Sequence, residues 1–120
     1  MPATPVEASV RRRAGIAIID FRGDINGFAE ESLSAAYSEA AVEGGRSIVL
    51  NFAEVDYINS TGIALIVGLL ARARKEGRRI SACGLSDHYR EIFEITRLAD
   101  FMEMFADEAS ALAGTSASAS

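Results

Sequence analysis

The chain has 120 residues, of which 49% are hydrophobic and 24% are charged, and this length and composition fit one globular domain. Its formal net charge of −5 disfavours a direct DNA or RNA binder, because an acidic chain repels nucleic-acid phosphates. With one cysteine and one histidine it can form neither an intrachain disulfide nor a standard Cys/His metal site, and we expect no metal and no cofactor.

The first elements are predicted to be two strands. Residues 1–7 contain both prolines and little periodicity, so we expect them to be flexible. A short strand is predicted at 8–13. The β-branched run GIAIIDF at 15–21, bounded by Gly23, predicts a second strand.

A helix is predicted at 26–43, because acidic residues lie near its start and Gly44-Gly45 is expected to end it. The residues that recur at helical spacing are Phe28, Leu33, Ala36, Tyr37 and Ala40. The run SIVLNF at 47–52 then predicts a short strand of the kind that is buried in a sheet. Residues 53–57 are expected to form a loop.

The next helix is predicted to begin within the segment 59–62, which reads Asn-Ser-Thr-Gly, and to run to about Glu76, before Gly77. Its stretch IALIVGLL at 63–70 is apolar almost all round. A helix with this pattern is buried or lies beneath a contact surface.

The C-terminal third is predicted to alternate in the same way. We expect a strand at 79–84, a helix at 87–96, a short strand within 98–105 and a helical turn or two at 107–113. The small polar sequence GTSASAS at 114–120 has nothing to bury and is expected to be a disordered tail. The apolar stripe of the helix at 87–96 comprises Tyr89, Ile92, Phe93 and Ile95.

Strands that alternate with helices predict an α/β domain at 8–113, in which about four helices pack on a mixed, partly parallel sheet of four or five strands. The N-terminus lacks the apolar segment of a signal peptide, and no apolar run is long enough to span a bilayer. We therefore expect a cytoplasmic protein without membrane insertion.

The segment 59–62 is the main functional candidate. Its polar side chains lie at a predicted helix N-terminus, where backbone N–H groups lack partners within the helix. One of them would suffice as an N-cap, which is the structural interpretation of the segment. In the functional interpretation, Ser60 is an exposed hydroxyl, and a phosphate added there would meet the positive end of the helix dipole. Gly62 would allow a close approach to the helix backbone.

Several motifs of the chain resemble the STAS family. The segment 59–62 stands where that family has Asp-Ser-Ser-Gly or Asp-Ser-Thr-Gly between a strand and an apolar helix. The segment FRGDIN at 21–26 looks like the family's Gly-Glu-Leu-Asp turn, and Thr96-Arg97-Leu98 stands where the family often has Thr-Gly-Leu. Gly84-Leu85-Ser86 is a further segment that resembles the family. The resemblance covers residues 10–113 and implies a STAS-like fold.

The resemblance is to the anti-sigma factor antagonists of this family, and it implies a partner-switching protein rather than an enzyme. The unmodified domain would sequester a kinase-type anti-sigma factor and so release a sigma factor for transcription. Phosphorylation would block this binding, and a PP2C-type phosphatase would restore it. By motif position Ser60 is the acceptor, with Thr61 as second choice. The implied partner-binding residues are Asp24, Asn26, Asn59, Ser60, Thr61 and Gly62.

Two residues depart from the family pattern. Asn59 replaces the aspartate of the motif, and Asn26 replaces the last acidic residue of the turn. Each change removes a negative charge but keeps a hydrogen-bonding side chain of similar shape, so repulsion of a phosphate would be weaker. A kinase that recognises the carboxylate would lose its contact. The alternative is therefore a constitutive STAS scaffold or transport-accessory subunit that phosphorylation does not control.

A small enzyme or nucleotide-binding module is the third interpretation. The sequence contains neither GxxxxGK[ST] nor GxGxxG, so no phosphate-binding loop is recognisable. Cys83 and His88 would be the one thiol–imidazole pair. We expect instead that Cys83 fills space at a strand end and that His88 lies on a solvated helix start.

Overall fold

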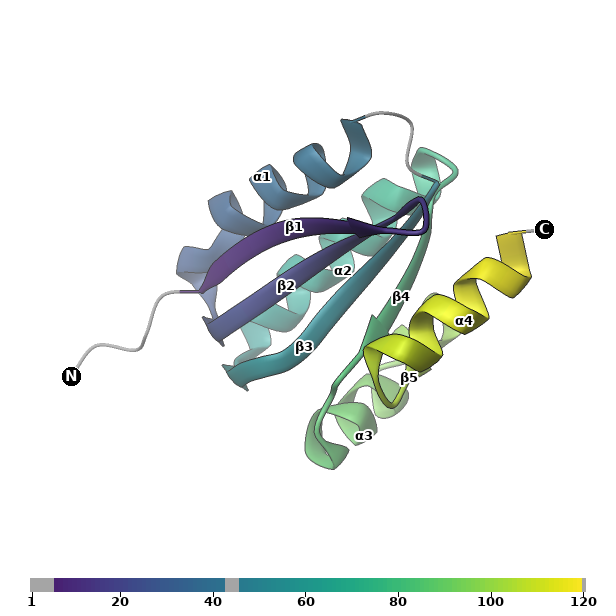
Figure 1. The fold of residues 1–120 in the computed structure, drawn as a ribbon. Coiled ribbons are helices and arrows are strands. Elements are labelled where there is room, and N and C mark those ends of the chain that lie inside the picture. Colours follow the sequence, from purple (N-terminus) through teal and green to yellow (C-terminus); the bar gives the residue numbers. More distant parts are fainter. Residues whose placement is uncertain (1–5, 43–45, 120) are drawn as a thin grey trace.

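Five strands form one sheet in the computed structural model, which describes residues 6–42 and 46–119 (Figure 1). The strands lie in the sheet in chain order. β1 pairs antiparallel with β2, and every later neighbour is parallel. The mixed, partly parallel sheet predicted from the sequence is thus confirmed. The strands are β1 (Glu7–Arg13), β2 (Ile16–Ile25), β3 (Ser47–Ile58), β4 (Arg79–Cys83) and β5 (Glu103–Phe105).

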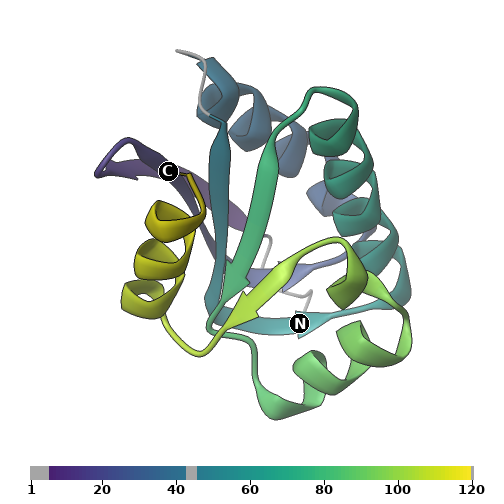
Figure 2. The ribbon, with the colours of Figure 1, turned by 90° about the vertical axis from the view of Figure 1, so that its right-hand side faces the viewer.

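Helices cover both faces of this sheet. Figures 1 and 2 show α1, α2 and α3 on one face and α4 on the other. Within the described residues, none of these helices is long and apolar enough to cross a membrane. The helices are α1 (Glu30–Ala41), α2 (Ser60–Lys75), α3 (Asp87–Ile95) and α4 (Glu108–Ala119), with short 3-10 helices η1 (Gly27–Ala29) and η3 (Leu98–Asp100).

The covering of both faces explains the continuous apolar run in β2. Successive strand residues point to opposite faces, so a strand buried on both sides needs apolar residues throughout. Ala17, Ile19 and Phe21 belong to the larger core, which includes residues of α1, α2 and α3. Ile16 and Ile18 belong to a smaller cluster that includes Ala111 of α4.

The central strands are longer than the sequence predicts. β2 was expected to end at Phe21 and residues 53–57 were expected to form a loop, but β2 and β3 stay paired as far as Ile25 and Ile58. Mutual pairing supplies the backbone hydrogen bonds of this polar stretch, so it needs no apolar pattern to remain extended. The register shifts between Asp20 and Arg22 and again between Gly23 and Asp24.

The C-terminal helix is also longer than predicted. The sequence predicted a helical turn or two at 107–113 and a disordered tail at 114–120, but α4 continues to Ala119. Thr115 is buried, and its hydroxyl lies 3.5 Å from that of Ser81 in β4. Gly114 packs against the ring of Phe105, which a Cβ would approach to 2.5 Å. Small residues in α4 allow the helix to lie close to the sheet.

Two residues assigned to apolar stripes are exposed. Phe28 is 93% exposed because it lies in η1, ahead of α1, and Ile95 is 71% exposed at the end of α3. The other members of both stripes are buried or half-buried. The predicted helix end at Gly44-Gly45 lies outside the described residues. Residues 1–5 and 120 are also outside them, and of the predicted flexible N-terminus Val6 is buried and Glu7 begins β1.

Candidate functional site

The N-terminus of α2 lies at the carboxyl ends of β2 and β3. Asp24 pairs with Tyr57 and Ile25 with Ile58, so the two strands end side by side. The backbone N–H of Asn59 then donates to the carbonyl of Ile25, at 3.2 Å. The structure therefore brings together the two segments that the sequence had grouped, 24–26 and 59–62.

Asn59 is the N-cap of α2. Its backbone is extended, with φ −90° and ψ 179°, and its side-chain oxygen accepts a hydrogen bond from the N–H of Gly62 at 2.8 Å. This settles which polar residue of the segment serves as the cap. Ser60 is the first residue of α2 and is exposed. Its hydroxyl has no hydrogen-bond partner within the described part of the chain, so the fold does not use it.

Gly62 lets the start of α2 lie directly on the end of β2. It is buried, and a Cβ added to it would lie 2.1 Å from the carbonyl oxygen of Ile25, far inside van der Waals contact. The sequence suggested that some group approaches the backbone at this glycine, and that group is the β2 backbone. In the predicted partner-binding set, Gly62 therefore positions Ser60 and offers no exposed side chain of its own.

Asn26 has a similar capping role one segment earlier. Its side-chain oxygen accepts a hydrogen bond from the N–H of Phe28 at 2.9 Å and so caps η1. The next residue, Gly27, lies beside α2, because a Cβ built on it would be 3.5 Å from the methyl group of Thr61. Thr61 is exposed, whereas Asp24 and Asn26 are half-buried.

The two departures from the family pattern are thus the two capping residues of the site. An amide oxygen and a carboxylate oxygen accept the same backbone hydrogen bond, and asparagine and aspartate are equally good N-caps. Replacing aspartate by Asn59 or Asn26 therefore keeps the local backbone and removes only the charge. The substitutions change the electrostatics around Ser60 without changing how the hydroxyl is presented.

Two exposed aromatic residues on the same segments were missed by the sequence analysis. Phe28 follows the Asn26 cap, and Tyr57, which is 56% exposed, precedes the end of β3. Phe28 was grouped with Leu33 at helical spacing, although the two are five positions apart, which places them on different faces of a helix. The capping residue Asn26 was the available signal, because it places Phe28 in the first turn, before the buried stripe begins.

The thiol of Cys83 lies apart from this site and is not set up as a nucleophile. It is buried at the end of β4, and burial raises the pKa of the thiol to about 11. His88 is exposed, and its ring contacts that of Tyr89 at a centroid distance of 4.9 Å. Among the described residues, no group of three or more His, Cys, Asp or Glu side chains could hold a metal ion.

Comparisons with known proteins agree with this architecture. A sequence model of the STAS domain matches residues 7–111. The anti-sigma-B factor antagonist of Staphylococcus aureus (strain NCTC 8325 / PS 47) is 30% identical over 82 residues, which cover 68% of this chain and 76% of that protein.

Two solved structures are similar in fold. The Bacillus cell fate determinant SpoIIAA in its phosphorylated form has a TM-score of 0.68 at 22% identity, and the match covers 90% of this chain and 98% of that one. A sulfate transporter family protein from Wolinella succinogenes has a TM-score of 0.74 at 18% identity, with 86% of each chain covered. At these identities the likeness shows the fold alone.

Proposed function

The chain belongs to the STAS domain family, and from this premise we propose that it is an anti-sigma factor antagonist switched by phosphorylation of Ser60. Unmodified, it sequesters a kinase-type anti-sigma factor, and a PP2C-type phosphatase reverses the modification. The observation that carries the proposal is the position of Ser60, which is exposed at the first turn of α2 while Asn59 supplies the cap.

The position of Ser60 supports an effect of the phosphate on binding rather than on folding. At the first residue of a helix, a phosphate meets the positive end of the helix dipole, so the modified chain keeps its fold. Asn59 already occupies the N–H of Gly62, so a phosphate on the exposed Ser60 would remain on the solvent side. A partner that packs over Ser60 would have to remove water from a nearly dianionic group, which is costly without a matching cation.

The relatives support both the proposal and its alternative. The Staphylococcus relative is named an anti-sigma-B factor antagonist, and SpoIIAA, which shares the fold, exists in a phosphorylated form. The Wolinella structure places the same fold in a sulfate transporter family, which favours a transport-accessory subunit as the second candidate function. The uncharged Asn59 and Asn26 also favour this second candidate, because a kinase that recognises a carboxylate at either position would lose its contact.

The deciding experiment is intact-mass measurement after incubation with the cognate kinase-type anti-sigma factor and ATP. We expect one added phosphate, which fragmentation places on Ser60. Thr61→Ala should still be modified and Ser60→Ala should not. If the kinase modifies a control substrate but not this chain, the constitutive scaffold or transport-accessory function replaces the proposal.

The binding side of the proposal is tested with charge variants of Ser60. Ser60→Glu is expected to weaken binding of the anti-sigma factor at least about tenfold, since a desolvated, unpaired charge costs more than the 1.4 kcal/mol that this factor represents. Ser60→Gln, of the same size but neutral, is the matched control and should bind more tightly than Ser60→Glu. Titration calorimetry measures both, and equal affinities would show that charge at Ser60 is not the switch.

A further inference from the structure

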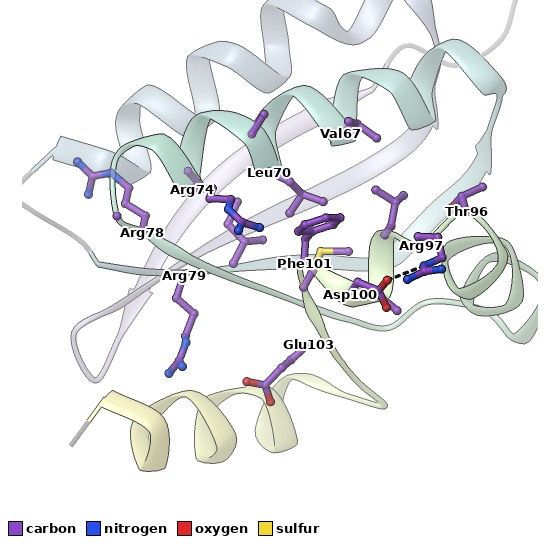
Figure 3. Close-up of a pocket in the computed structure, with 17 residues that line it drawn as sticks. Val67, Leu70, Arg74, Arg78, Arg79, Thr96, Arg97, Asp100, Phe101 and Glu103 are labelled. Carbon is purple, nitrogen blue, oxygen red and sulfur yellow. Dashed lines mark hydrogen bonds and ion pairs between the residues drawn. The ribbon is translucent and has the colours of Figure 1, made fainter.

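A cavity of about 860 Å³ lies near the C-terminal end of α2, away from Ser60 at its N-terminus (Figure 3). It is bounded by α2, by the beginning of β4 and by the segment 96–103. Val67 and Phe101, at its mouth, are 44% and 57% exposed. Its floor consists of buried core residues: Leu70, Ala73, Ile80, Leu98 and Met102.

Two of the arginines that line the cavity are already engaged by carboxylates. Arg97 binds Asp100 at 2.6 Å, and Arg78 binds Glu76 at 3.1 Å. Each of these guanidinium groups therefore already has a carboxylate partner, and Glu76 is shared with Arg72.

Arg74 differs from these two. Its guanidinium lies over the ring of Phe101, 5.2 Å from the centroid, and within the described residues it forms no ion pair with a carboxylate. Figure 3 shows Arg79 and Glu103 extending towards α4, away from Arg74 and Phe101. An arginine that lies over an aromatic ring does not use its N–H groups in that contact, so they remain able to bind a carboxylate or phosphate.

The floor restricts what the rest of the ligand can be. It consists of aliphatic and thioether side chains, and the described residues contain no buried side-chain nitrogen or oxygen without a hydrogen-bond partner. A nucleobase would bury polar groups there without partners, which is unfavourable. An alkyl chain has no such groups and gains from leaving water.

We propose that this cavity is a binding site for a small anionic amphiphile, with an alkyl chain on the apolar floor and a carboxylate or phosphate held by Arg74. Local charge supports the anion, because Arg74 provides a cation that has no carboxylate partner among the described residues. The volume is within the range of small-molecule sites. The site does not depend on the proposed switch at Ser60.

The test uses decanoate as the probe. Its binding is measured by titration calorimetry and amide NMR, below the concentration at which decanoate forms micelles. We expect decanoate to bind with a dissociation constant below about 1 mM, shifting the amides of 96–103, and acetate and 1-decanol to bind at least about tenfold more weakly. Decyl phosphate in place of decanoate shows which anionic headgroup is preferred.

Two variants locate the site and one serves as the control. Arg74→Gln should weaken decanoate binding at least about tenfold, and Ala71→Trp, at an exposed position of the lining, should abolish it by filling the mouth. Arg90→Gln changes an exposed arginine of α3 outside the cavity and should leave binding unchanged. Thermal unfolding confirms that each variant is folded.

The proposal is overturned if decanoate does not bind, if 1-decanol binds as tightly, or if Arg74→Gln and Arg90→Gln bind it equally. Ser60→Glu should bind decanoate like the original chain, so failure of the phosphorylation switch and failure of this site are observed separately.

Discussion

At the scale of single residues, the presentation of Ser60 depends on a glycine that touches β2. Gly62→Ala would place a Cβ 2.1 Å from the carbonyl oxygen of Ile25, and we expect it to lower the free energy of unfolding by about 3 kcal/mol, because backbone must move. Gly68→Ala is the matched control in the same helix. Its Cβ meets no atom within 4 Å, so it should raise stability by about 0.5–1 kcal/mol. Urea unfolding measures both, and similar effects would contradict the close contact.

The identity of the cap is a second residue-scale prediction. Asn59→Ala should lower the free energy of unfolding by about 1 kcal/mol, because the N–H of Gly62 loses its acceptor, whereas Asn59→Asp should leave it nearly unchanged. Ser60→Ala should also change it by less than about 0.5 kcal/mol. Chemical unfolding distinguishes these cases. A loss for Ser60→Ala as large as that for Asn59→Ala would mean that the hydroxyl is part of the fold.

The sequence could indicate which segments form the candidate site, but not which role each of their residues has. Three adjacent residues of 59–62 were all capable of capping, and only the backbone geometry identifies Asn59. The exposure of Phe28 was missed because the residue was grouped with Leu33 at helical spacing, although the two are five positions apart. The helix that buries Leu33 begins two residues after Phe28, at Glu30. Spacing is a property of the chain, whereas exposure depends on where an element starts.

At the scale of elements, truncation tests whether the end of α4 contributes to stability, although its composition predicted a disordered tail. A chain that ends at Ala113 loses the packing of Gly114 on Phe105 and the buried Thr115, and we expect it to be about 2 kcal/mol less stable. A chain that ends at Thr115 keeps both contacts and should lose less. Thermal unfolding of the two truncations decides the point, since a disordered tail would make both as stable as the full chain.

Element boundaries were harder to predict than element types. The alternation of strands and helices was recognised because each element has a periodic or continuous apolar run. The second half of β3 lacks such a run, because its backbone is satisfied by pairing with β2 while its side chains are largely exposed. The length of α4 was hidden because small residues carry little periodicity, and their value lies in a close approach to a sheet that only the fold supplies.

At the scale of the whole molecule, the order of the elements predicted the mixed sheet, and the parallel pairing of β2 and β3 explains why 24–26 and 59–62 meet at one edge. The cavity could not be predicted in this way. Its walls come from α2, β4 and the segment 96–103, and no motif in any one of them indicates a shared opening. The residues that line the cavity form no recognisable motif in the sequence, and only the fold brings them together.

The ion pairs of Arg11 give a prediction for the stability of the fold in acid. Arg11 in β1 binds Asp20 in β2, with Nη2 2.9 Å from Oδ1, and also binds Glu108 in α4. The hydrogen bond from Arg11 lowers the pKa of Asp20 below its ordinary value of 3.8. The unfolded chain therefore binds more protons, so stability is complete above about pH 4–5 and is lost as the pH falls through the folded-state pKa. Asp20→Asn should flatten this loss, as measured by urea unfolding from pH 2.5 to 6.

Above about pH 9 the stability of the fold should fall as the pH rises, because burial raises the pKa of Cys83 from 9.0 to about 11. Between these values the thiol ionises in the unfolded chain but stays protonated in the fold, so the unfolded state is favoured progressively as the pH rises from about 9 to 11. Burial also raises the pKa of Tyr37, which acts in the same direction. Cys83→Ala should therefore reduce the alkaline slope without removing it. An unchanged slope in urea unfolding at pH 8–11 would mean that the thiol ionises equally in both states and is not held in an apolar setting.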